Sequence, residues 1–176
     1  MQGPGTLEWQ AATDDFVAAP VHDALAGWSH AADVLAAPID ADLADTAAFC
    51  EHYGVLPEDS ANCVVIAGRR GEAVRYAACV VLATTRADVN GTVRRRLDAK
   101  KASFAAMDDA VALSGMEYGG ITPIGLPADW PVLVDRAVMA RAVVVIGSGL
   151  RRSKLALPPA ALAGLPNAEV IDGLAG

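Results

Sequence analysis

Cysteine and histidine, the residues that most often form disulfides or hold metals, are scarce in this chain of 176 residues. The three cysteines share no close spacing, so the sequence predicts neither a disulfide framework nor a paired metal knuckle. The three histidines lie in the first third of the chain, and none has a second histidine or cysteine at a ligand spacing. We therefore expect reduced, buried thiols and no metal ion; the residues concerned are Cys50, Cys63, Cys79, His22, His30 and His52.

Long apolar runs are also missing. No stretch approaches the length of a membrane span, and residues 1–5 lack the basic start and apolar stretch of a secretory signal. These features predict a cytoplasmic protein that does not insert into a membrane. No Gly-x-x-x-x-Gly-Lys-Ser/Thr loop is present, and Gly147-x-Gly149 matches a dinucleotide fingerprint poorly because position 152 is arginine. The sequence predicts no cofactor.

Basic residues are absent from the first 68 positions, although the chain has fourteen in total. Residues 1–68 hold eleven acidic side chains and sum to −11, whereas residues 69–176 hold ten acidic and all fourteen basic side chains and sum to +4. The overall net charge of −7 therefore conceals a basic second part of the chain.

The basic residues gather in three short clusters. They are Arg69 with Arg70, Arg94 to Arg96 with Lys100 and Lys101, and Arg151 and Arg152 with Lys154. Taken singly, each cluster is more typical of a solvated surface that balances an acidic one. Taken together, the clusters favour a basic rim that contacts phosphates, which gives affinity and orientation without reading base sequence. The candidate tRNA contacts within them are Arg94, Arg95, Lys100, Lys101, Arg151 and Arg152.

The hydrophobic content of 53% and the length favour one domain with a sizeable core. Capping residues predict a helix over residues 45–53 that stops at Gly54. Residues 63–67 and 74–84 read as a β-hairpin with a glycine turn at 68–71. Further expected elements are an edge strand at 6–10, a helix after Pro20, strands at 34–39 and 142–146, and short helices at 90–97, at 108–113 and from Pro158.

These elements predict an α+β fold. The expected architecture is a mixed, largely antiparallel sheet that is curled into a partial barrel and surrounded by short helices.

Residues 115–125 contain four glycines and a proline. Glycine lets main-chain groups approach a ligand without an intervening Cβ, and proline holds one φ angle, so this segment predicts a preorganised loop that contacts a ligand. Its centre, Gly119-Gly120-Ile121-Thr122-Pro123, resembles the Gly-x-x-x-Pro loop of the YbaK/EbsC family, the YbaK and prolyl-tRNA synthetase associated editing domain. The order of the surrounding features is similar from about residue 43 to the C-terminus. We interpret residues 1–42 as an N-terminal extension packed on an editing domain of residues 43–176.

The resemblance implies an aminoacyl-tRNA deacylase that acts in trans on mischarged tRNA, with tRNA(Pro) editing as the family's usual theme. Aminoacyl-tRNA is the implied partner, and an aminoacyl-tRNA synthetase is a second one. An ester is already activated, so backbone groups can position a water molecule and stabilise the oxyanion. The implied catalytic residues are Asn62, Gly119, Gly120, Thr122 and Pro123, and the implied substrate-binding residues are Asp135, Gly147, Ser148, Gly149 and Lys154. Asp135, Gly147, Ser148 and Gly149 are equally typical of turn and capping positions.

Two positions depart from the family pattern. Many members have a lysine where this chain has Asn62, and several have an acidic residue where it has Lys154. A neutral amide forms hydrogen bonds about half as strong as charge-assisted ones. Either the chemistry depends mainly on the backbone, or activity is altered or lost. The alternatives to a deacylase are thus a catalytically weak module that binds a tRNA end, a nucleotide or a small aminoacyl ligand, and, more distantly, an unrelated small-molecule enzyme.

Overall fold

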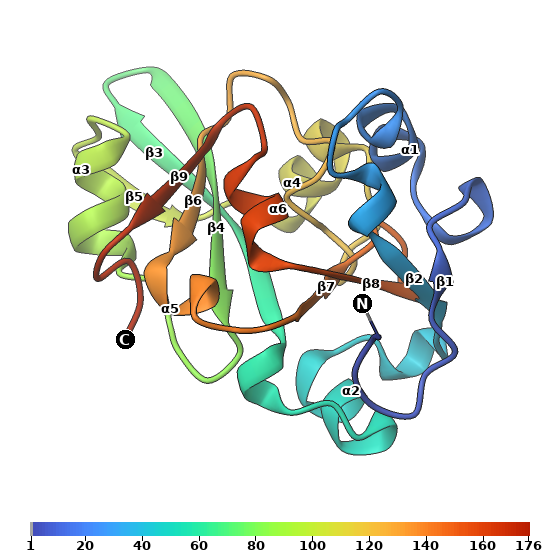
Figure 1. Ribbon diagram of the computed structural model, residues 1–176. Coiled ribbons are helices and arrows are strands. Elements are labelled where there is room, and N and C mark those ends of the chain that lie inside the picture. Colours follow the sequence, from blue (N-terminus) through green and yellow to red (C-terminus); the bar gives the residue numbers. More distant parts are fainter. Residues whose placement is uncertain (1) are drawn as a thin grey trace.

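Two β-sheets form the framework of the protein (Figure 1). The computed structural model describes residues 2–176. A five-stranded sheet has the order β5-β3-β4-β6-β9, and a four-stranded sheet has the order β1-β2-β8-β7. The strands are β1 (Gln10–Ala11), β2 (Leu35–Pro38), β3 (Ala61–Arg70), β4 (Ala73–Leu82), β5 (Lys101–Phe104), β6 (Val132–Asp135), β7 (Val144–Gly147), β8 (Ser153–Leu157) and β9 (Ala168–Ile171).

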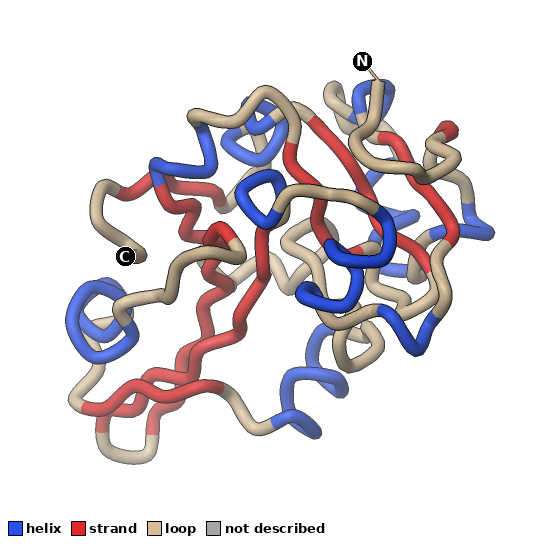
Figure 2. The backbone as a smooth tube through the Cα atoms, turned by 90° about the horizontal axis from the view of Figure 1, so that it is seen from below, coloured by secondary structure: helices blue, strands red, loops and turns tan. Residues whose placement is uncertain are grey.

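Short helices surround the two sheets instead of forming a layer of their own, as Figure 2 shows. The α-helices are α1 (Ala19–Leu25), α2 (Thr46–Tyr53), α3 (Arg94–Arg96), α4 (Met107–Ser114), α5 (Arg136–Met139) and α6 (Pro159–Ala163). A π-helical turn, Val89–Val93, leads into α3, and 3₁₀ turns lie at Asp14–Phe16, Ala31–Asp33, Ala41–Leu43 and Pro57–Asp59. No helix within residues 2–176 is long and apolar enough to cross a membrane.

The β3-β4 hairpin is the longest regular element. Its strands pair from Ala61↔Leu82 to Arg70↔Ala73, so the turn is at Gly71 and Glu72 and the prediction of a turn at 68–71 is three residues early. Gly68 lies within β3, paired with Arg75. A Cβ at this position would be 2.9 Å from the Cβ of Ala99, so the glycine permits close packing and does not form the turn. The predicted strand at 6–10 is also wrong, because β1 pairs only at Gln10 and Ala11.

The strand pairing is largely antiparallel. Among the paired strands of residues 2–176, β4-β6 and β6-β9 are the parallel pairs, and both belong to the larger sheet. The two sheets approach each other where Ser60, just before β3, forms a parallel bridge with Val145 of β7. The predicted mixed α+β fold with short helices is confirmed. The strands of residues 2–176 form two sheets and no closed barrel, and the partial barrel stays a prediction.

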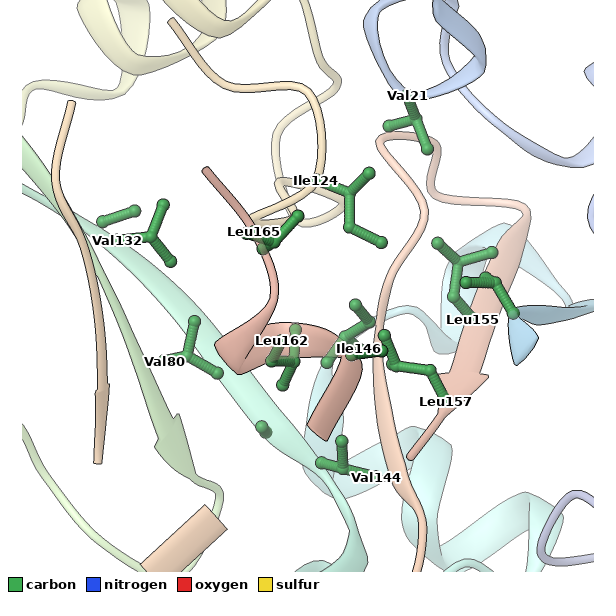
Figure 3. Packing of buried hydrophobic residues seen from close by; sticks show 14 of the residues in the cluster. Val21, Val80, Ile124, Val132, Val144, Ile146, Leu155, Leu157, Leu162 and Leu165 are labelled. Carbon is green, nitrogen blue, oxygen red and sulfur yellow. The ribbon is translucent and has the colours of Figure 1, made fainter. Parts of the chain in front are cut away.

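Apolar side chains from both sheets meet in the main core (Figure 3). Val80 comes from the larger sheet, Ile146 and Leu155 come from the smaller one, and Leu162 of α6 lies between them. Ile124, which is fully buried in this core, anchors the glycine-rich segment to it.

Residues 2–42 pack closely on the rest of the chain. Strand β2 lies between β1 and β8, and Val21 and Leu25 of α1 are buried in the main core. We retain the division into an extension of residues 1–42 and an editing domain of residues 43–176 as a proposal.

Candidate functional site

A cavity of about 520 Å³ lies where the two sheets approach each other. It is bounded by the start of α2, the start of β3, the end of β5 with the start of α4, the glycine-rich segment, β7 and one side chain of β8. The residues that line it are Ala44, Asp45, Thr46, Phe49, Ser60, Ala61, Asn62, Cys63, Val64, Val65, Phe104, Ala105, Met107, Ala110, Tyr118, Gly119, Ile121, Val145, Ile146, Gly147 and Lys154.

The glycine-rich segment forms one wall of the cavity. Helix α4 stops at Gly115, whose φ of 69° is left-handed, and Gly119 has a φ of 79°. The segment is held to the loop after β7 by two main-chain hydrogen bonds: Glu117 N–H donates to Gly149 O (2.9 Å), and Gly149 N–H donates to Gly120 O (2.7 Å). Within residues 2–176 the N–H groups of Gly119 and Ile121 have no acceptor, and both residues line the cavity. Both are therefore unpaired main-chain donors on residues of the cavity wall.

Gly147 and Gly120 permit the close approach of the two loops. A Cβ at Gly147 would be 2.6 Å from Gly120 O, and a Cβ at Gly120 would be 2.8 Å from the carbonyl of Leu150. Real Cβ atoms do not come so close to backbone, so any larger residue at either position would move the wall.

Asn62 lies at the start of β3 and faces the cavity. Its Oδ1 accepts a 2.6 Å hydrogen bond from Oγ1 of Thr46, the first residue of α2. This bond fixes the amide and leaves the Nδ2 donors for a ligand.

Lys154 of β8 supplies a cation to the cavity although its side chain is buried. Its Nζ donates to Ala44 O at 3.0 Å and lies 5.2 Å from the centre of the Phe49 ring. Burial, with a smaller contribution from the nearby Arg151 charge, lowers the pKa of Lys154 from 10.5 to about 8. The amine therefore titrates near neutral pH, and its charged form would repel a substrate ammonium group instead of binding it.

Other predicted residues stabilise the walls. Thr122 and Pro123 are buried beside the cavity, and Thr122 Oγ1 has no partner within residues 2–176. Ser148 Oγ is within 2.7 Å of Ser153 Oγ and accepts from Leu150 N–H, and Gly149 has a φ of 87°, so both shape the loop after β7.

Asp135 lies outside the cavity lining. It ends β6, immediately before α5, and accepts a hydrogen bond from Ala175 N–H at 3.2 Å. The structure brings Asn62, Gly119, Gly147 and Lys154 together and leaves Asp135 elsewhere.

The basic residues divide into two groups. Arg94, Lys100 and Lys101 line a common depression with Arg69, whereas Arg95 is exposed on α3. Arg151 braces the glycine-rich segment: its guanidinium donates to the carbonyls of Tyr118 (3.2 Å) and Ala41 (3.1 Å).

Arg152 donates to Asp15 O at 2.6 Å, so its guanidinium is engaged with the N-terminal region. One continuous basic rim around the glycine-rich segment stays a prediction.

Several lining residues were not expected from the sequence, in particular Phe49, Phe104 and Tyr118. Thr46 was identified only as a helix start. The unusual exposure of Phe104 (65%) and Tyr118 (60%) depends on tertiary structure, and no local sequence pattern predicts it.

Side-chain nucleophiles and metal clusters receive no support. Burial, together with the neighbouring Cys79, raises the pKa of the Cys63 thiol far above its usual value, so this thiol stays protonated. Within residues 2–176, no three His, Cys, Asp or Glu side chains group as metal ligands.

Comparison with known proteins places this geometry in a class. The profile of the aminoacyl-tRNA editing domain matches residues 40–165. The chain thus belongs to the aminoacyl-tRNA editing domain family, of the YbaK type. No curated protein sequence matches it significantly.

Solved structures share the fold at low sequence identity. A proposed trans-editing enzyme for prolyl-tRNA synthetase superposes with a TM-score of 0.73 at 20% identity, over 87% of this chain and 93% of that one. A structure from the computational design of scaffolds that present linear epitopes has a TM-score of 0.74 at 21% identity, over 88% of this chain and 95% of that one. The hypothetical protein APE2540 has a TM-score of 0.67 at 22% identity, over 79% of this chain and 86% of that one.

Proposed function

We propose that this protein is a deacylase that acts in trans in the cytoplasm and hydrolyses the ester of a mischarged tRNA. The observation that carries the proposal is that Gly119 and Ile121, whose N–H groups have no acceptor within residues 2–176, line the same cavity as Asn62 in a chain of the editing-domain family. The structural similarity to a proposed trans-editing enzyme for prolyl-tRNA synthetase supports tRNA(Pro) as the substrate type and a synthetase as a partner.

In the proposed reaction, water attacks the ester carbonyl between the amino acid and the ribose of the terminal adenosine. The Gly119 and Ile121 N–H groups stabilise the oxyanion, since donors aimed at developing charge are the largest usual contribution to such a step. Asn62 Nδ2 orients the ester, and Thr122 and Pro123 hold the loop. Collapse of the intermediate breaks the ester bond and releases the free amino acid and uncharged tRNA.

The lining of the cavity bears on the side chain of the substrate. Apolar side chains line much of the interior, among them Phe49, Val65, Ile121 and Ile146. Such a pocket discriminates between amino acid side chains by their size, and it disfavours a side chain whose polar group would be buried without a hydrogen-bond partner. We therefore propose small amino acids, such as alanine or cysteine, as the misattached residues.

A catalytically weak module that binds a tRNA end is the second candidate. Asn62 favours it, because a neutral amide replaces the ammonium that many family members have there, and a single amide stabilises an anion less.

One experiment separates the two functions. Single-turnover deacylation would be measured on a panel of correctly and incorrectly charged tRNAs, without added metal, with wild type and Asn62→Ala side by side. Selective hydrolysis of one mischarged species that is lost in Asn62→Ala would support the deacylase. Binding without hydrolysis across the whole panel would overturn it in favour of the binding module.

A further inference from the structure

The catalytic cavity continues into a groove along β5. A cavity of about 670 Å³ shares Asn62, Val64 and Phe104 with the first. A third cavity, of about 510 Å³, shares Asn90, Ala102 and Ser103 with the second. We name the second and third cavities together, which follow β5 from Asn62 past Phe104 and Ser103 to the basic residues, the β5 groove. Its far end is lined by Arg69, Arg94, Lys100 and Lys101.

The four cations at the far end are arranged unfavourably for folding alone. Arg69 and Lys101 are directly opposite each other on β3 and β5, where Cβ atoms are about 5 Å apart and like charges destabilise the sheet. Among the described residues, no carboxylate lies within salt-bridge distance of any of the four. In contrast, the neighbouring Arg70 and Arg96 pair with Asp98 and Glu169. An anionic ligand would relieve the repulsion between the unpaired cations.

Phe104 lies where the catalytic cavity opens into the groove, and 65% of its surface is exposed. An exposed aromatic ring beside a basic groove is the arrangement that binds single-stranded nucleic acid, in which bases stack on rings and cations follow the phosphates. Lys101 precedes Phe104 by three residues, roughly 10 Å along the strand, so the two side chains project to opposite faces of β5. Because β5 is the edge strand of the larger sheet, a nucleic acid strand that crosses this edge can contact both.

One carboxylate, that of Asp88, also lines the groove. It is occupied by the N–H groups of Gly91 and Thr92 and by the Thr92 hydroxyl, and these hydrogen bonds lower its pKa. Arg86 lines the same cavity and offsets its charge.

We propose that the β5 groove binds the single-stranded 3′ end of the tRNA. Phe104 stacks on a base next to the ester, and Arg69, Arg94, Lys100 and Lys101 hold the phosphates that precede it. This assignment rests on the proposed function. In this assignment the 3′ end of the tRNA runs from the basic end of β5 toward Asn62. Arg151 and Arg152 brace the loops.

The test is equilibrium binding of uncharged tRNA and of the same tRNA without its single-stranded 3′ end, followed by fluorescence anisotropy at several salt concentrations. The variants are Lys100→Ala/Lys101→Ala and Phe104→Ala. Matched controls are Arg75→Ala/Arg136→Ala, which removes two charges outside the groove, and Leu56→Ala, which removes an exposed apolar side chain (59% exposed) outside it. Thermal unfolding verifies that each variant is folded.

We expect the lysine pair to weaken binding of intact tRNA tenfold or more and to reduce the slope of log K against log salt by roughly 1.4, about 0.7 for each phosphate contact on a single strand. Phe104→Ala should weaken binding of intact tRNA about tenfold and leave binding of the truncated tRNA unchanged. Both controls should bind as wild type does.

Equal losses in the groove and control variants would overturn the assignment, as would a Phe104 effect that survives truncation. The cations on β5 have two other conceivable roles. Lysines on an edge strand prevent edge-to-edge pairing of sheets, and the cations could instead bind the acidic residues 1–68 of a second copy of the chain. A changed oligomeric state of the groove variants with unchanged tRNA binding would replace the proposal with one of these two roles. If wild type hydrolyses charged tRNA but the groove variants bind normally, only this inference fails; if wild type does not bind tRNA, the proposed function fails.

Discussion

The hydroxyl of Thr46 donates a 2.6 Å hydrogen bond to Oδ1 of Asn62 across sixteen residues of sequence. It joins the first turn of α2 to the first residues of β3, so the orientation of the amide in the cavity depends on the position of a helix. A neutral amide must be held in one orientation to direct its donors, whereas an ammonium presents donors in several directions.

Removal of this bond should impair the reaction more than stability. We expect Thr46→Val to lower the single-turnover rate about tenfold and the free energy of unfolding by about 1 kcal/mol, the usual net value of one hydrogen bond. Thr6→Val, which loses a hydroxyl bond to Tyr53 O away from the cavity, is the matched control. In a double-mutant cycle with Asn62→Ala the two effects should not add; additive losses would show that Thr46 does not act through Asn62.

Gly119 and Gly27 provide a second matched pair. Their φ angles are 79° and 77°, so an alanine at either position costs a similar 1–2 kcal/mol of backbone strain. A Cβ at Gly119 would enter the cavity wall and meet the Arg151 guanidinium, whereas a Cβ at Gly27 has nothing within 4 Å. We expect similar losses of unfolding free energy in urea and a loss of turnover in Gly119→Ala alone. Unchanged turnover in Gly119→Ala would refute the backbone mechanism.

Lys154 makes stability depend on pH. Its pKa is about 8 in the folded protein, below the ordinary 10.5, so between these values the unfolded chain binds more protons and the free energy of unfolding rises with pH. Below pH 8 the full cost of burying the charge is present. Lys154→Met should therefore be more stable than wild type by about 1–3 kcal/mol at pH 7, after the lost bond to Ala44 O is counted, and this advantage should fall steadily as the pH rises from 8 to 10.5.

Denaturant unfolding of both proteins from pH 6 to pH 10.5 checks this prediction. Arg75→Met, at an exposed cation, is the control and should show no such difference. A stability difference that is constant over this range would contradict the assigned pKa.

A lysine at position 62 is expected to be harmful. Asn62 and Lys154 line the same cavity, so a second ammonium would repel the first and lower the pKa of Lys154 further. We expect Asn62→Lys to lose about 1 kcal/mol of unfolding free energy at pH 7 and to gain no deacylation rate. A large gain of hydrolysis would instead identify wild type as the catalytically weak binding module.

Local signals in the sequence were sufficient for several elements. Asp45 and Gly54 bracket α2 as predicted: Asp45 is the N-cap residue, although its side chain makes no cap hydrogen bond, and Gly54 ends the helix with a left-handed φ. Helix α4, the β3-β4 pairing and the opening of α6 by Pro158 and Pro159 were predicted for similar reasons. The turn of the hairpin was misplaced because Gly68 serves the packing of Ala99, a contact that lies outside its local window.

What the sequence by itself determined is the glycine-rich wall, since left-handed φ angles and close backbone approach require glycine wherever the segment is placed. Tertiary structure decided what faces that wall. Lys154 contacts Ala44, and Arg151 contacts Ala41, each across 110 residues, and the exposure of Phe104 follows from where β5 ends on the larger sheet. These contacts depend on the pairing of distant strands, whose register is set by burial of whole faces and not by neighbours in sequence.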